Sequence, residues 1–108
     1  MYVNKEVLRY WVTLGASRIG LGYNALAKEL NTNPGRTHHW FRGVHSVDDL
    51  VAVEVMAYFH ARGAFPEFGE GLKALADMRI DQAKVKTLIN SKVVPNANEK
   101  AFVRALEK

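Results

Sequence analysis

The sequence predicts an all-α protein, a compact helical bundle of six or seven helices. Apolar residues recur mostly at intervals of three and four, as they do along one face of a helix. No convincing alternating strand is followed by a hairpin turn. With 108 residues, of which 48% are hydrophobic and 24% charged, the chain has the composition of a folded globular protein and is too short for a large multi-domain enzyme.

A first helix is expected to begin after Asn4, whose side chain can cap it. Gly15 and Ala16 are small enough to let another helix approach closely. The segment Gly20–Gly22 ends this helix, because glycine readily adopts the left-handed conformation found just past helix ends. The residues expected to face inward are Leu8, Trp11, Val12 and Ile19.

Two short helices with a tight break between them follow. The first should run from about Tyr23 to Leu30, and Asn31 can supply a left-handed turn residue because asparagine tolerates positive φ. Asn33 is a good N-cap and Pro34 a favoured first helical residue. The second helix is therefore expected over Pro34–Arg42, with Gly43 ending it.

The rest of the chain is predicted to form four more helices. Ser46 and Asp49 resemble a capping box at the start of a long helix that reaches about Arg62. Residues 65–69 are a predicted connector whose aromatic side chains plug the core, and residues 93–96 form the last loop. The further helices are expected at about 70–78, 82–91 and 99–107.

The charges are arranged in three blocks. Residues 1–45 are basic, residues 46–77 acidic and residues 78–108 basic, with a net charge of +4 for the whole chain. This balance favours a polyanionic partner. The absence of cysteine and of a long apolar N-terminal run predicts a cytoplasmic protein that neither spans a membrane nor is exported by a signal peptide.

The helix expected over Pro34–Arg42 has two different faces. At about 100° per residue, Thr37, Trp40 and Phe41 share one side and should pack inward. The opposite side carries Gly35, His38, His39 and Arg42, with Arg36 at its edge. A helix, a tight turn and a short helix with outward cationic and hydrogen-bonding groups is a common way to enter the DNA major groove.

The segment RIGLGYNALAKELNTNPGRTHHWFRG, residues 18–43, resembles the helix-turn-helix of the Xre/Cro family of phage-type regulators. Leu26, Ala27, Leu30, Trp40 and Gly43 carry the match, which covers about a quarter of the chain. Asn31 stands where that family usually has Gly, and Thr37 stands where it prefers Ile or Val. Together with the side-chain chemistry, the resemblance implies base reading by Gly35, Arg36, His38 and His39, and phosphate binding by Tyr23, Arg42 and His45.

These observations predict a sequence-specific regulator of transcription that binds double-stranded DNA as a homodimer, a repressor of phage or mobile-element type. No enzyme activity, catalytic residue, cofactor, metal or small-molecule substrate is expected. One alternative is an antirepressor or antiactivator that keeps the fold but binds a protein, for which the acidic middle and the long apolar helix would suit. Another is a metal-dependent enzyme that uses the four histidines, His38, His39, His45 and His60.

The C-terminal region, residues 63–108, permits two interpretations beside the DNA-binding domain expected over residues 1–62. Shifting the first motif by 48 positions places Asn33 on Asp81, Arg36 on Lys84, Thr37 on Val85 and Trp40 on Leu88. A second helix-turn-helix-like unit would then present a further DNA-contacting face, formed by Lys84, Lys86, Thr87 and Asn90. The alternative is a helical hairpin for dimerisation, built on Leu72, Leu75, Leu88, Phe102 and Leu106.

Overall fold

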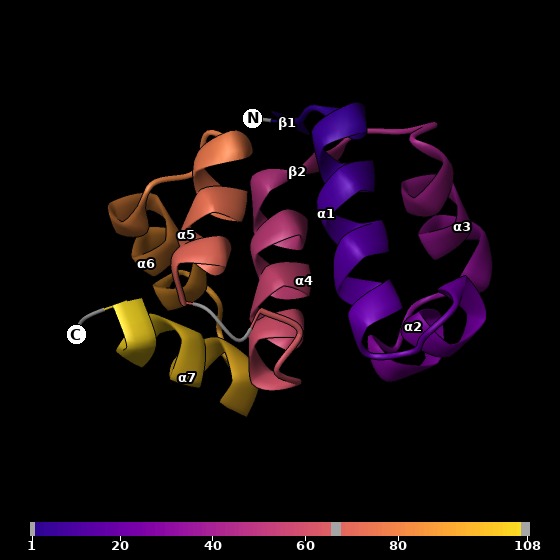
Figure 1. Ribbon diagram of the computed structural model, residues 1–108. Coiled ribbons are helices and arrows are strands. Elements are labelled where there is room, and N and C mark those ends of the chain that lie inside the picture. Colours follow the sequence, from indigo (N-terminus) through magenta and orange to yellow (C-terminus); the bar gives the residue numbers. More distant parts are fainter. Residues whose placement is uncertain (1, 66–67, 107–108) are drawn as a thin grey trace.

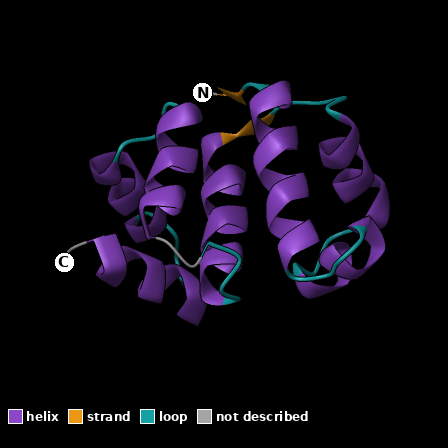
Figure 2. Ribbon diagram, in the orientation of Figure 1, coloured by secondary structure: helices purple, strands orange, loops and turns teal. Residues whose placement is uncertain are grey.

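The computed structural model describes residues 2–65 and 68–106, which form seven helices and two short strands (Figure 1). Apart from the two short strands, all of the regular secondary structure is helical, as the sequence predicts (Figure 2). In chain order the elements are β1 (Tyr2–Val3), α1 (Lys5–Arg18), α2 (Tyr23–Glu29), α3 (Pro34–Arg42), β2 (Val47–Asp48), α4 (Asp49–Ala61), α5 (Phe68–Asp77), α6 (Gln82–Asn90) and α7 (Ala97–Leu106).

Helix α4 is the centre of the molecule. Helices α1, α2 and α3 lie on one side of it, and α5, α6 and α7 lie on the other (Figure 1). The buried residues of α4 point in all directions around its axis: Ala52, Val53, Val55, Met56, Ala57, Tyr58 and Phe59. One apolar cluster therefore runs from Val3 to Leu106 through α4, and the boundary expected at residue 62 does not separate two cores.

Helix α1 forms as its sequence predicts. The Asn4 side chain accepts hydrogen bonds from the backbone N–H groups of Glu6 and Val7, which satisfies two donors that have no partner within the helix. Gly15 faces the ring of Phe59 on α4, and a Cβ at Gly15 would lie 2.9 Å from that ring. The missing side chain thus lets α1 and α4 approach closely.

The start of α4 differs from the prediction. Asp48 caps α4 by accepting a hydrogen bond from the N–H of Val51, so Ser46 and Asp49 do not form the expected capping box. The reason is that residues 47–48 are extended as β2 and pair antiparallel with β1, Val3 opposite Val47 and Tyr2 opposite Asp48. This pairing joins residues more than forty positions apart, and the local sequence pattern carries no signal for it.

The second half also has boundaries that the periodicity missed. Helix α5 begins at Phe68, inside the predicted connector, and residues 66–67 lie outside the described part. Helix α7 begins at Ala97, because Asn96 and Glu99 each accept a hydrogen bond from the other's N–H. The predicted end of that helix at residue 107 also lies outside the described part. Phe65 is buried against Trp11 and Phe59, as the core role of the connector predicts.

The apolar residues that were candidates for a dimerisation hairpin pack largely into the core of this chain. Leu75, Phe102 and Leu106 are buried in the common core, and Leu72 and Leu88 are half-buried against it. They are therefore not an open face for pairing with a second subunit. Within the described ranges, no helix is both long enough and apolar enough to cross a membrane.

Candidate nucleic-acid interface

The pair α2 and α3 forms a tight corner around the predicted turn. Asn31 has a φ of 55°, and the N–H of Thr32 donates to the carbonyl oxygen of Ala27 at 2.9 Å. Asn33 then caps α3 by accepting a hydrogen bond from the N–H of Arg36 at 2.8 Å. Ala27 is fully buried where the helices meet, so all of the local features predicted for this turn are confirmed.

Thr37 has a specific role at this corner. It is completely buried, and its hydroxyl donates to the backbone oxygen of Tyr23 at the start of α2, with an O···O distance of 2.8 Å. A buried hydroxyl that has a partner avoids the cost of an unsatisfied polar group. The residue that departs from the resembled family therefore ties α3 to α2 rather than leaving a polar defect.

The inward and outward faces of α3 agree with the helical geometry. Thr37 and Trp40 are buried and Phe41 is half-buried, whereas Gly35, Arg36, His39 and Arg42 are exposed. The guanidinium carbon of Arg36 lies 5.8 Å from the centre of the Trp40 ring, a cation–π distance. The exposed guanidinium group of Arg36 thus lies against the buried ring of Trp40.

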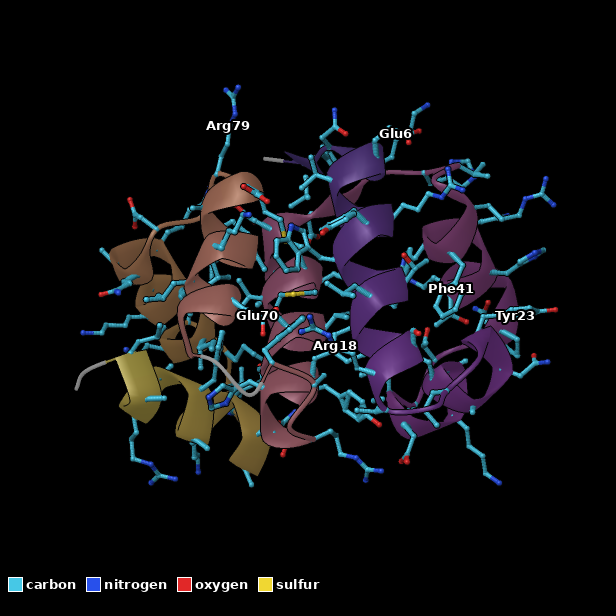
Figure 3. All side chains as sticks on the ribbon, viewed as in Figure 1. Glu6, Arg18, Tyr23, Phe41, Glu70 and Arg79 are labelled. Carbon is cyan, nitrogen blue, oxygen red and sulfur yellow. The ribbon has the colours of Figure 1, made fainter. Side chains whose placement is uncertain are left out.

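His38 is placed differently from the other predicted base-reading residues. Its ring stacks on the ring of Tyr23, with centroids 4.5 Å apart and an interplanar angle of 24°. Tyr23 also contacts Phe41 edge to face, and the two side chains lie near each other beside α2 and α3 (Figure 3). One face of His38 is therefore covered, and Tyr23 and His38 together form the α2-side edge of the exposed α3 surface.

The other edge of this surface follows the end of α3. The rings of His39 and His45 meet edge to face at 4.6 Å, and both line a hollow of about 220 Å³ together with Arg36, Tyr2 and Ser46. Gly43 ends α3 with a φ of 65°. A Cβ at Gly43 would lie 3.2 Å from the Arg9 side chain, so α1 brings Arg9 next to the end of α3.

Arg9 is a functional candidate that sequence reasoning missed. It is exposed, and its contact with the exposed carboxylate of Glu6 is long, at 3.9 Å. Arg9 lies beside Gly43, which Arg42 precedes and His45 follows in the chain, so three cationic or protonatable residues occur around the end of α3. The contact between α1 and Gly43 depends on how the helices pack, and the position of Arg9 in the sequence does not predict it.

Helix α3 itself carries no carboxylate, although the exposed carboxylate of Glu6 on α1 lies near Gly43 at its end. No Asp or Glu occurs between Asn33 and Val47. Within the part of the chain that the structure describes, Arg36 and Arg42 form no salt bridge. Arg36, Arg42 and the neighbouring histidines are therefore available to an external polyanion.

Several carboxylates of the acidic middle form ion pairs within the protein. Three of them pair with cations of the two basic blocks: Asp49 with Lys84 at 2.7 Å, Glu54 with Lys92 at 3.0 Å and Glu70 with Arg18 at 2.7 Å. Lys92 also contacts the buried carboxylate of Glu99 at 2.7 Å. Carboxylates of the acidic block thus form ion pairs with cations of both basic blocks, and these pairs join segments that are distant in the sequence.

Two of these pairs shift pKa values in the direction expected for strong partners. The hydrogen bond from Lys84 holds the pKa of Asp49 below its ordinary value, although partial burial opposes the shift. Desolvation alone would lower the pKa of Lys92. Hydrogen bonds to Glu99 and Glu54 outweigh desolvation, and the pKa of Lys92 is raised.

The turn between α5 and α6 repeats the local geometry of the first one. Arg79 has a φ of 61°, the N–H of Ile80 donates to the carbonyl oxygen of Leu75 at 2.9 Å, and Asp81 caps α6 through the N–H of Lys84 at 2.8 Å. The outward residues are less cationic than those of α3. Lys84 is half-buried against Asp49 and Lys86 is also half-buried, whereas Thr87 and Asn90 are exposed. The hydroxyl of Thr87 donates to the Ala83 carbonyl.

The four histidines do not converge on one point. His38 and His39 flank opposite edges of α3, whereas His60 lies against Phe102, where α4 meets α7. In residues 2–65 and 68–106, no cluster of three or more His, Asp or Glu side chains has the arrangement of a metal site. Comparisons with protein-family models, curated proteins and solved structures gave no significant match for the chain.

Proposed function

We propose that the protein binds double-stranded DNA sequence-specifically through α3 and regulates transcription, as a repressor of phage or mobile-element type. The observation that carries this proposal is the two-sided character of α3. Thr37 and Trp40 anchor one side in the core, and Gly35, Arg36, His39 and Arg42 project from the other without a carboxylate among them. An exposed helix with this chemistry fits the major groove.

Within this surface, we assign base reading to Arg36 and His39, and to Gly35 through close backbone approach. Arginine can donate two hydrogen bonds to guanine, and a good pair of this kind discriminates between bases by about 1–3 kcal/mol. His38 stacks on Tyr23 and therefore presents its edge from a fixed position. Phosphate contacts are assigned to Arg42, His45, Arg9 and the Tyr23 side of the surface, where they position the helix without reading sequence.

A homodimer is part of the proposal, because one such unit reads only a few base pairs and two half-sites supply useful specificity. The protein-binding alternative was suggested by the acidic middle and by the long apolar helix, and both are partly used within the fold. Three carboxylates of the acidic middle, Asp49, Glu54 and Glu70, form internal ion pairs, and most apolar residues of α4 are buried.

Selection of bound duplexes from a random pool at physiological salt tests the proposal. We expect enrichment of a two-part site whose half-sites are separated by about one helical turn. Arg42→Ala should weaken binding to all sequences and lower the salt dependence, whereas Arg36→Ala should relax preference at particular base pairs. Absence of any enriched sequence would show that the protein is not a specific regulator.

A further inference from the structure

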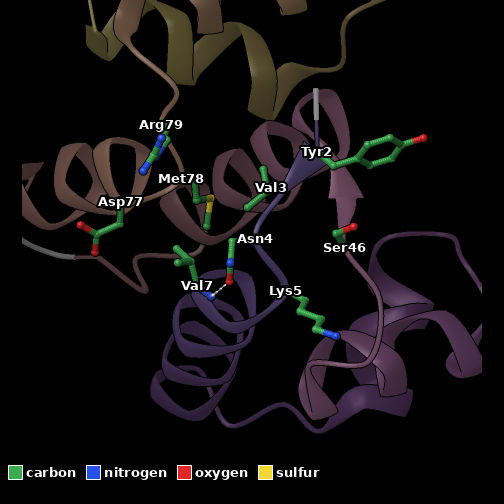
Figure 4. A pocket seen from close by; sticks show the side chains of 9 residues that line it. All are labelled: Tyr2, Val3, Asn4, Lys5, Val7, Ser46, Asp77, Met78 and Arg79. Carbon is green, nitrogen blue, oxygen red and sulfur yellow. Dashed lines mark hydrogen bonds between the residues drawn. The ribbon is translucent and has the colours of Figure 1, made fainter.

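A second feature of the molecule is a hollow of about 740 Å³ on the edge that carries β1 and the α5–α6 turn (Figure 4). This volume lies within the range of about 300–1,000 Å³ found for small-molecule sites. Its lining comes from both halves of the protein: Tyr2, Val3, Asn4, Lys5, Val7, Ser46, Asp77, Met78 and Arg79. No residue expected to contact DNA is among them.

The apolar part of the lining and the charged part are separate. Val3 and Met78 are buried and Val7 is half-buried, so they form an apolar base. Lys5 and Arg79 are exposed and line the hollow from α1 and from the α5–α6 turn (Figure 4). The Ser46 hydroxyl adds a neutral hydrogen-bonding group. An apolar body with an anionic group would match both parts.

The fold does not require a cation at either position. Among the described residues, Lys5 and Arg79 have no salt-bridge partner, and Lys5 is at the first position of α1, where the helix dipole disfavours a cation. Arg79 adopts a φ of 61°, a conformation in which an arginine is unusual. The turn between α5 and α6 accounts for this conformation, as it does at Asn31, but it does not require an arginine there.

Arg79 is also badly placed to serve the DNA surface. It projects from the half of the molecule formed by α5 and α6, whereas α3 lies at the opposite side beyond α1 and α4 (Figure 3). A duplex held on the exposed face of α3 would be directed away from it. The carboxylate of Asp77 also lines the hollow, but one of its oxygens accepts a hydrogen bond from the Trp11 indole N–H at 3.0 Å.

We propose that this hollow binds a small organic anion, a carboxylate or phosphate carried on an apolar body, held between Lys5 and Arg79 over Val3, Val7 and Met78. Tyr2 and Ser46 line both this hollow and the smaller one that contains Arg36 and His39. Ser46 follows the end of α3 by only four residues. The ligand therefore also acts as an effector of DNA binding, and this part rests on the proposed function.

The anion site is tested without DNA on the full chain. Phenylacetate and phenyl phosphate are titrated separately while backbone amide NMR signals are followed, with neutral phenylacetamide as the comparison ligand. We expect saturable shifts at Val3, Lys5, Ser46 and Arg79 for at least one anion, and much weaker binding of the amide. Binding of one anion alone supports the site and identifies its preferred group; no saturable shift with either anion, or equal binding of the amide, overturns it.

Matched variants separate this site from general charge effects. Lys5→Gln with Arg79→Gln should weaken anion binding about tenfold or more, because two charged donors are lost. Lys73→Gln with Lys100→Gln removes the same charge from exposed positions on α5 and α7 and should leave the affinity unchanged. Equal weakening by both double variants would overturn the site.

The effector role is measured on the selected duplex. Saturating anion should change the DNA affinity of the unmodified protein but not that of the Lys5→Gln, Arg79→Gln variant. An unchanged DNA affinity with the hollow saturated would refute the effector role and leave the anion site standing. If the protein binds no DNA at all, the proposed function fails, while the titration without DNA still decides whether the anion site exists.

Discussion

The two turns at Asn31 and Arg79 have the same local structure but hold their helices differently. Each has a left-handed residue, the same backbone hydrogen bond from the residue just before the cap, and a side-chain cap on the next helix. Helices α2 and α3 close tightly over Ala27. In the second unit Leu75 occupies the matching position, and a hollow of about 380 Å³ remains in the corner between α5 and α6.

The difference has a consequence for the surfaces that the two units present. Helix α3 packs on α1 and α2 and keeps its cationic side free, whereas α6 packs on α4 and α7 and uses Lys84 to bind Asp49. The two helices also lie on opposite sides of α4 (Figure 1). A turn motif therefore sets the direction of the chain, and the partners of the following helix decide which side chains remain available.

The largest difference in stability is expected for variants in α3 and α6, the second helices of the two helix pairs. Trp40→Ala removes a buried ring from the α3 interface and should lower the free energy of unfolding by about 3–5 kcal/mol. Leu88→Ala, at the matching position of α6, should cost distinctly less because Leu88 is only half-buried. Urea unfolding of both variants measures the difference, and equal losses would mean that the two units pack alike after all.

The helix crossing gives the next effect. Ala27→Leu should destabilise the protein by about 1–3 kcal/mol, since extra methyl groups have no room where α2 meets α3. Ala25→Leu makes the same change at an exposed position of α2 and serves as the control. If Ala27→Leu is tolerated as well as Ala25→Leu, the tight crossing is not what distinguishes α2–α3 from α5–α6.

A third experiment tests the ion pair between Lys84 of α6 and Asp49 of α4. The pKa of Asp49 is lowered by Lys84, so this pair stabilises the fold above the ordinary aspartate pKa and loses its effect as pH falls through the lowered value. Lys84→Met should cost about 1 kcal/mol or less at pH 7 and nothing at a pH where Asp49 is protonated in both states. Arg36→Met, which breaks no ion pair among the described residues, should show no such pH dependence.

The smallest effect concerns the turn residues themselves. Arg79→Gly should stabilise the protein by up to about 1 kcal/mol, because glycine adopts positive φ without steric cost. The gain for Asn31→Gly should be smaller, since asparagine already tolerates this conformation. Thermal unfolding of both variants provides the comparison, and a larger gain at Asn31 would contradict this account of the two turns.

The sequence by itself determined most of the N-terminal half. Local signals specified the Asn4 cap, the left-handed Asn31, the Asn33–Pro34 start and the Gly43 end of α3, because capping and turn conformations depend on side chains within a few residues. The helical period likewise separated the inward side chains Thr37 and Trp40 from the outward side chains of α3.

Only the tertiary structure decided which of these local units presents a usable surface. The pairing of β1 with β2 moved the cap of α4 to Asp48, the Thr37 hydroxyl found its partner on α2, and Arg9 reached the end of α3 from another helix. Lys84 of α6 forms an ion pair with Asp49 of α4, which lies 35 positions earlier in the sequence. Such contacts depend on how whole helices pack around α4, and the local patterns of capping and period do not contain that information.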